Sequence, residues 1–213
     1  MSRIVVDSIR NSSASSDGIT LASDGSVTIP GNATCSGTAT GFGGGKILQV
    51  VNNEKTDTAS TSGNTGGNGG TLSFTDTPGI NVTITPVAAS SRILVEFFLG
   101  KACHNGNSTI IRCTRSVAGG TATAIKNGDA AGSRPVGLTN ITYKINNNHA
   151  ESLYFRFVDS PSYSVGQAIV YQMQVNTETG NSFYVNRSIT DANEGYNYRA
   201  RCFSCTTATE IGA

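Results

Sequence analysis

The stretch RILVEFFL, residues 92–99, is nearly continuous in apolar side chains. A run of this length that is rich in β-branched and aromatic residues is typical of a β-strand, and we expect it to be buried on both faces. Shorter runs that alternate between apolar and polar residues lie on either side of it, with Gly, Asn and Pro between them. Their spacing of roughly 8 to 15 residues indicates an all-β fold, an antiparallel β-sandwich or jelly roll. The further strands are predicted at residues 46–51, 80–86, 109–115, 141–145, 152–158, 167–175, 182–187, 199–205 and 208–211.

Composition narrows the class of protein. Only 14% of the 213 residues are charged, against about 25% in an average soluble protein. The net charge of +1 gives no basic surface for nucleic acid or for an anionic membrane. No apolar run approaches the roughly 18 residues of a membrane span, and the start MSRIVVDSIRNSS has no apolar segment of the kind that a secretory signal needs. These features exclude a membrane protein and disfavour an ordinary metabolic enzyme. The abundance of Gly, Asn and Thr, which disfavour helix, excludes an all-α protein.

The first 45 residues differ from the rest of the chain. They contain few side chains large enough to build a core, and they end in the cluster GFGGG at residues 41–45, which we interpret as a hinge. Asp17-Gly18-Ile-Thr-Leu is echoed by Asp24-Gly25-Ser-Val-Thr-Ile, and each unit is typical of a short strand after a tight turn. Such an arm buries too little surface to offset its ordering entropy. We therefore predict a β-rich arm, residues 1–45, that intertwines with its copies or docks elsewhere, and a sandwich domain, residues 46–213.

The sequence assigns no catalytic, cofactor-binding or metal-binding residue. Five cysteines without a secretory signal favour reduced thiols over a disulfide framework. Cys202 and Cys205 are spaced C-x-x-C, but on a strand they would point to opposite faces, and no second ligand pair accompanies them. His104 and His149 lie in Asn-rich sequence, so we expect solvated loop residues rather than general bases. The prediction is a protein that is not an enzyme and takes no cofactor.

Several short motifs resemble a known group of proteins. The arm sequence VVDSIRNSSASSDGITLASDGSVTIPG resembles the N-terminal segment of tail-fibre-like structural virion proteins of marine tailed phages, of the cyanophage type. The body is similar to a domain that recurs in the same proteins. The motifs that carry this similarity are KILQVV at 46–51, ITPVAASSRILVEF at 84–97, Ile111-Arg112, FYVNRSITD at 183–191 and Thr209-Glu210-Ile211.

The resemblance implies a structural virion component, assembled in the host cytoplasm and forming a homotrimer. Residues 1–45 would attach it to other virion proteins of the tail or capsid, and the body would be displayed as a short fibre that contacts a host-surface glycan or protein. Two alternatives stay open: a capsid decoration protein that stabilises the shell, and a virion-associated enzyme that degrades glycans.

If the body contacts a receptor, loops between strands are the expected place, because sandwich loops carry variable surface. The candidate residues are Tyr196, Tyr198 and His104. The two tyrosines offer large amphipathic faces at low entropic cost. The alternative, which the sequence slightly favours, is that both are packing residues at a subunit interface. The loops considered are residues 60–70, 104–107, 126–134 and 193–198.

Overall fold

The computed structural model describes residues 6–16, 18–29, 46–62, 72–142, 146–178 and 180–213. The chain forms two compact units, Met1–Gly44 and Gly45–Ala213. The boundary predicted at residue 45 lies beside this division.

The first unit contains three very short antiparallel strands, in the order β1 (Ser8–Ile9), β2 (Ile19–Leu21) and β3 (Val27–Thr28). The turn between β2 and β3 is set by local chemistry. Asp24 accepts a hydrogen bond from the Ser26 amide at 2.8 Å, and Gly25 has a φ of 85°, which glycine adopts without strain. The short strands expected after the two Asp-Gly turns are thus confirmed. None of this unit's described residues is buried.

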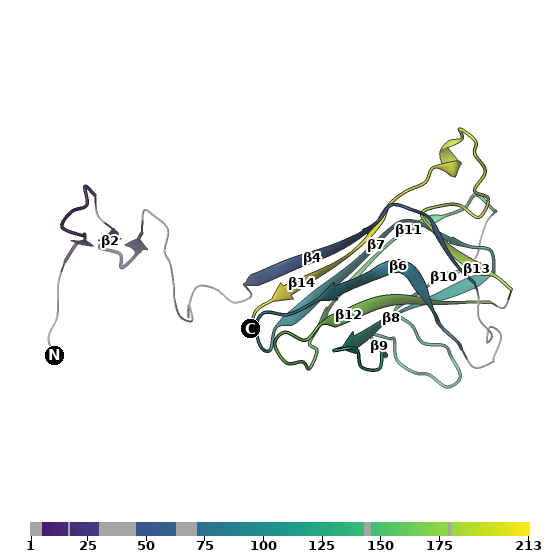
Figure 1. Cartoon of the computed structure of the whole chain (residues 1–213), viewed down its shortest axis with the longest axis horizontal. Helices are drawn as coiled ribbons and strands as arrows, with labels where there is room; N and C mark the ends of the chain where they lie inside the picture. The colour runs from purple at the N-terminus through teal and green to yellow at the C-terminus, as the bar shows by residue number, and fades with distance from the viewer. Residues whose placement is uncertain (1–5, 17, 30–45, 63–71, 143–145, 179) are drawn as a thin grey trace. The chain divides into compact units, whose positions relative to one another are not determined.

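The second unit is a β-sandwich, which confirms the predicted all-β class (Figure 1). Its eight principal strands pair as one long antiparallel hairpin rolled on itself, since β8 pairs with β10, β7 with β11, β6 with β12 and β4 with β14. This nesting is the jelly-roll arrangement. The strands are β4 (Ile47–Lys55), β5 (Ala59–Ser62), β6 (Thr75–Ile84), β7 (Arg92–His104), β8 (Ser108–Val117), β9 (Thr123–Ile125), β10 (Thr139–Thr142), β11 (Glu151–Asp159), β12 (Ile169–Thr177), β13 (Ser182–Val185) and β14 (Ser204–Ile211).

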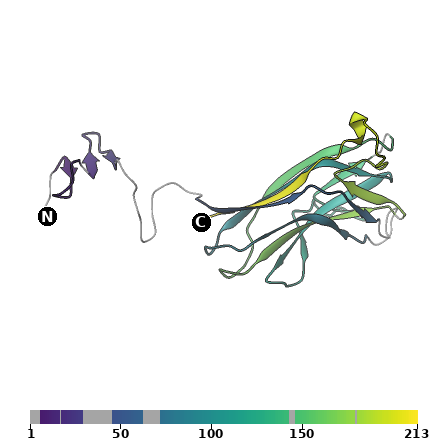
Figure 2. The same ribbon diagram turned by 45° about the horizontal axis from the view of Figure 1, so that its top comes forward.

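The strands form two sheets. We call β4-β14-β7-β11, with β13 and β5, the β7 sheet, and β6-β12-β8-β10, with β9, the β8 sheet. Alternate residues of both sheets point inward and form one core. The largest fully buried side chains of that core include Tyr171, Phe97 and Phe183. Figure 2 shows the two layers from a second angle.

The structure corrects three details of the sequence prediction. RILVEFFL is buried on one face only in the single chain: Ile93, Val95, Phe97 and Leu99 are buried, and the residues between them are partly exposed. The strands predicted at 199–205 and 208–211 are a short 3₁₀ helix, η1 (Asn197–Arg199), followed by the single strand β14. Of the loop predicted at 60–70, residues 60–62 belong to β5, and 63–70 lie outside the described residues.

The strand directions give the body two distinct ends. β4 starts at Ile47 and β14 finishes at Ile211, and these two residues are partners in the ladder. The connections 85–91 and 160–168 lie at that same end, whereas 105–107, 146–150 and the segment 186–203 lie at the other. Figure 1 shows the C-terminus at one end of the body and the yellow segment with η1 at the other. No helix among the described residues has the length and apolar character to cross a membrane.

Candidate functional site

Three of the motifs that carry the resemblance meet at one buried carboxylate. Glu210, on β14, is fully buried. Its Oε1 accepts hydrogen bonds from the Ser91 hydroxyl at 2.8 Å and from the Ala88 amide at 3.1 Å. Its Oε2 accepts from the Val87 amide at 3.0 Å and from Gln49 Nε2 at 2.6 Å. Glu210 thus fixes the connection between β6 and β7, and with it the position of one sheet relative to the other.

The environment of Glu210 favours its charged form. Burial alone raises the pKa of the carboxyl, but the hydrogen bonds from Gln49, Val87, Ser91 and Ala88 outweigh it and hold the pKa below its ordinary value of 4.5. Four donors of the chain occupy the two oxygens of this buried carboxylate, so we interpret the corner as a structural brace.

The motif FYVNRSITD organises the other end of the body. Asn186, which is buried and has a φ of 63°, donates to the carbonyls of Lys55 and Asp57 at 2.8 and 2.9 Å. Its side-chain oxygen accepts from the Ser204 hydroxyl at 2.6 Å. Lys101 Nζ donates to the carbonyls of Tyr198 and Ala200. These contacts tie both ends of the segment 186–203 to the β7 sheet.

Ion pairs hold the middle of the same segment. Asp191 accepts from Arg201 Nη2 at 2.6 Å, and Arg187 lies 3.5 Å from the same carboxylate oxygen. The Arg201 hydrogen bond and the nearby positive charges hold the pKa of Asp191 below its ordinary value of 3.8. Arg199 pairs with Glu194 at 3.2 Å. The predicted loop 193–198 is therefore a braced structure, and an open polar hollow is lined by Asp191, Ala192, Asn193, Glu194, Arg199 and Arg201.

Tyr196 and Tyr198 lie on this braced segment and point to solvent. Their rings stack with centroids 5.2 Å apart and an interplanar angle of 10°. They remain 58% and 43% exposed. The Arg199 guanidinium lies 5.2 Å from the Tyr198 ring centroid. The result is a flat aromatic surface beside a positive charge, of the kind that stacks on sugars or planar side chains.

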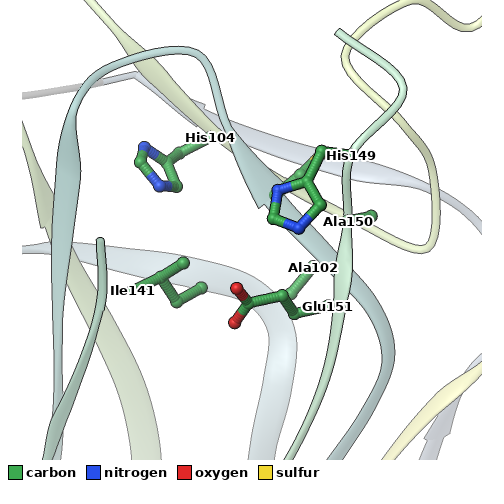
Figure 3. A pocket seen from close by; sticks show the side chains of 7 residues that line it. Ala102, His104, Ile141, His149, Ala150 and Glu151 are labelled. Atoms are coloured by element: carbon green, nitrogen blue, oxygen red, sulfur yellow. The ribbon is translucent and has the colours of Figure 1, made fainter. Parts of the chain in front are cut away.

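His104 ends β7 at the same end of the body but is buried, so the expectation of a solvated loop residue is wrong for it. It is the last residue of β7 and only 2% exposed, because β7 continues past Leu99 to pair with β13 through His104 and Phe183. A side chain this buried offers no receptor surface in the single chain. Figure 3 shows its ring beside a small cavity whose other labelled residues include His149, from the turn before β11, and Glu151, from the start of β11.

The thiol in the wall of this cavity is not activated. The wall includes Cys103, and burial raises the pKa of that thiol to about 11, so it is protonated at neutral pH. The described part of the chain contains no group of three or more His, Cys, Asp or Glu side chains placed to hold a metal ion. The four described cysteines, Cys103, Cys113, Cys202 and Cys205, are free thiols.

The two remaining predicted loops, residues 105–107 and 126–134, lie in different places on the body. Residues 105–107 lie at the same end as the tyrosine pair, where the Asn107 amide donates to Glu178 at 3.1 Å. Residues 126–134 follow β9, and Gly128 and Asp129 line a groove beside β8 and β10. Tyr196 and Tyr198 thus stack on a segment tied to the β7 sheet, whereas the loop 126–134 follows a strand of the β8 sheet.

Comparison with known proteins identifies no family. No protein-family model matches the chain, and no curated protein matches it. Among solved structures, the chain aligns with one titled "Structure of infectious bursal disease virus Gx strain" at 11% identity and a TM-score of 0.35. The alignment covers 89% of this chain and 46% of that one, so this chain spans less than half of its length. A likeness at this level carries no argument about function.

Proposed function

We propose that the protein is a structural virion component, a homotrimeric short fibre or tail-fibre subunit of a tailed phage. Residues 1–45 attach it to the particle, and the sandwich presents the Tyr196–Tyr198 surface to the host. The resemblance of the sequence motifs supports the virion role. The contrast between a small unit with no buried described residue and a well-packed sandwich supports the division of labour.

The polarity of the sandwich is the observation that carries the proposal. The body begins at Lys46, and β4 then runs for nine residues, or about 26 Å, toward the opposite end. At that far end lies the segment 186–203 with its stacked tyrosines. A domain attached through its N-terminal end thus presents this aromatic surface outward.

The test uses the full chain as a competitor for phage adsorption to host cells. The wild-type protein should block adsorption, and the variant Tyr196→Ala plus Tyr198→Ala should lose this effect while its oligomeric mass stays unchanged. The matched control is Val87→Ala plus Val165→Ala, which removes two exposed apolar side chains from the end where the body begins. It should compete as well as wild type.

Three results would contradict the proposal. Failure of the tyrosine variant to assemble would make the pair a packing element. Hundreds of copies per particle, counted by mass spectrometry of purified virions, would favour a decoration protein. Hydrolysis of host polysaccharide by the purified chain would indicate an enzyme.

A further inference from the structure

One outer face of the sandwich carries most of the body's exposed apolar side chains. On the β7 sheet, the residues that point away from the core form rows across the strands, such as Val50–Thr209–Leu94–Val158. Val50 is 59% exposed and Val158 is 40% exposed. We call this surface the apolar face. Its large exposed hydrophobic residues are Ile47, Val50, Tyr154, Val158 and Phe203, and Leu94, Phe98, Cys205 and Ile211 lie among them partly buried.

The outer face of the β8 sheet, which we call the amide face, is different. None of the body's exposed large hydrophobic residues among the described ones lies on it. Gln172, Gln174 and Arg112 form its centre, and Arg112 Nε donates to Gln174 Oε1 at 2.8 Å. Asn81 Nδ2 donates to Gln172 Oε1 at 3.1 Å. This surface is complete in a single chain.

The charges on the apolar face are balanced. Two acidic residues, Glu54 and Glu96, and two basic residues, Arg92 and Arg156, point outward from β4, β7 and β11, three of the four strands of this face. Glu96 and Arg156 are cross-strand partners at the centre of the face, and the Tyr154 hydroxyl donates to the Glu96 carboxylate. A surface with equal numbers of both signs carries no net charge that would repel another copy of itself.

We propose that the apolar face is the interface at which copies of this chain associate. The sequence of β7 argues for a covered face, because its outward residues include Leu94 and Phe98 as well as Glu96, whereas a solvated sheet face carries mainly polar residues. Phe203 packs on Phe98 with ring centroids 5.6 Å apart and extends this apolar surface. The balanced charges favour a second copy over a strongly charged partner.

The size of the face fits this occupant. Four strands at about 4.8 Å spacing, each about 26 Å long, give a flat area of about 500 Å² before side-chain relief is counted. A standard interface takes roughly 800 Å² from each partner, which is the same order. The inference concerns how copies meet, and it does not depend on the assembly belonging to a virion.

The test compares charge insertion on the two faces of the full chain. Val158→Glu places a carboxylate on the apolar face, and Thr83→Glu places the same group at an exposed position of β6 on the amide face. We expect Val158→Glu to raise the dissociation constant at least about 100-fold, since an unpaired charge would be buried at the interface. Thr83→Glu should leave it unchanged. Sedimentation equilibrium measures the dissociation constants of both variants, and circular dichroism checks that each variant is folded.

Alkylation of Cys205 gives a second measurement that does not depend on total mass, because the N-terminal arm could hold copies together by itself. Cys205 points outward on the apolar face between Glu54 and Phe98. In the wild-type assembly we expect it to react at least about 10-fold more slowly than in Val158→Glu. Faster alkylation in that variant supports the interface whether or not the mass falls.

Two outcomes would overturn the inference. One is a Val158→Glu variant whose mass and Cys205 alkylation rate both equal those of wild type. The other is equal dissociation by Thr83→Glu. If Val158→Glu does not fold, Val50→Lys on β4 takes its place with the same expected results.

Discussion

The apolar face and the amide face belong to one sandwich, and on both sheets buried and outward residues alternate along each strand. The outward side chains nevertheless differ, because those of the amide face form hydrogen bonds within the chain and many of those on the apolar face have no polar group. On the amide face, Gln172 Nε2 donates to the carbonyls of Thr77 and Met173 at 3.0 and 2.7 Å, so the polar groups are satisfied within the chain. On the apolar face, Val50 and Val158 remain 59% and 40% exposed without a polar group that water could bind. The difference teaches that the alternation of buried and outward residues does not by itself define how polar the outward face of a sheet is.

The two faces stay distinct only while the sheets keep their relative position, which the hydrogen bonds of Glu210 hold. We therefore expect the largest loss of stability from a substitution at Glu210. Glu210→Gln removes the charge that accepts from Gln49, Val87, Ala88 and Ser91 and places an amide donor among donors. Hydrogen bonds to a buried charge contribute more than neutral ones. We expect the free energy of unfolding to fall by about 3 kcal/mol, measured by urea denaturation.

The same corner predicts how stability depends on pH. The folded-state pKa of Glu210 lies below its ordinary value, so its contribution is fully present above about pH 4.5 and is lost as the pH falls through the folded pKa. Wild type should therefore lose stability on acidification below pH 4.5 more steeply than Glu210→Gln. The measurement is the melting temperature of both proteins between pH 3 and 7. Parallel plots of melting temperature against pH would contradict the assignment of this pH dependence to Glu210.

A truncation on the amide face should have the next largest effect. Gln172→Ala removes the donor to Thr77 and the acceptor of Asn81, where β6 and β12 pair irregularly. Because these partly buried groups are left unpaired, we expect the free energy of unfolding to fall by about 2 kcal/mol. The measurement is chemical denaturation. An unchanged midpoint would mean that water replaces Gln172, and the contrast between the faces would weaken.

The smallest effect should come from the apolar face in the dissociated chain. Val50→Thr keeps the shape of an exposed side chain, so the stability of the monomer should change by no more than about 0.5 kcal/mol. The same substitution should weaken association, because it adds a hydroxyl to a surface that is covered only in the assembly. Dilution series that separate unfolding from dissociation measure the two effects. A large loss of monomer stability would show that Val50 is already packed within the chain.

Much of the fold followed from local pattern. Period-two alternation located most strands of the body, because a sheet with one buried face requires apolar residues at every second position. The short strands β5 and β9 were missed, since Ala59–Ser62 and Thr123–Ile125 carry little pattern of their own. They form because β13 and β8 offer unpaired edges beside them.

The candidate site was predicted only in part. Tyr196 and Tyr198 lie on an exposed segment, as a loop position implies, but their stacking depends on a brace of arginines and acids that no spacing rule connects. His104 was misplaced because Asn and Gly after it indicate a loop, whereas the edge of β13 extends β7 to that residue. The apolar face had one sequence signal, the unbroken run at residues 92–99.

The sequence by itself determined the all-β class, the positions of the main strands and the distinction between the arm and the body, because these depend on side-chain periodicity and on composition over short distances. The tertiary structure alone decided that Glu210 meets Val87 across 123 positions of the chain and that Tyr196 and Tyr198 lie at the end opposite Lys46. It also decided that one sheet keeps an apolar outer face. These features arise from pairing between strands far apart in sequence, and the energy of such pairing depends on the partner rather than on local preference.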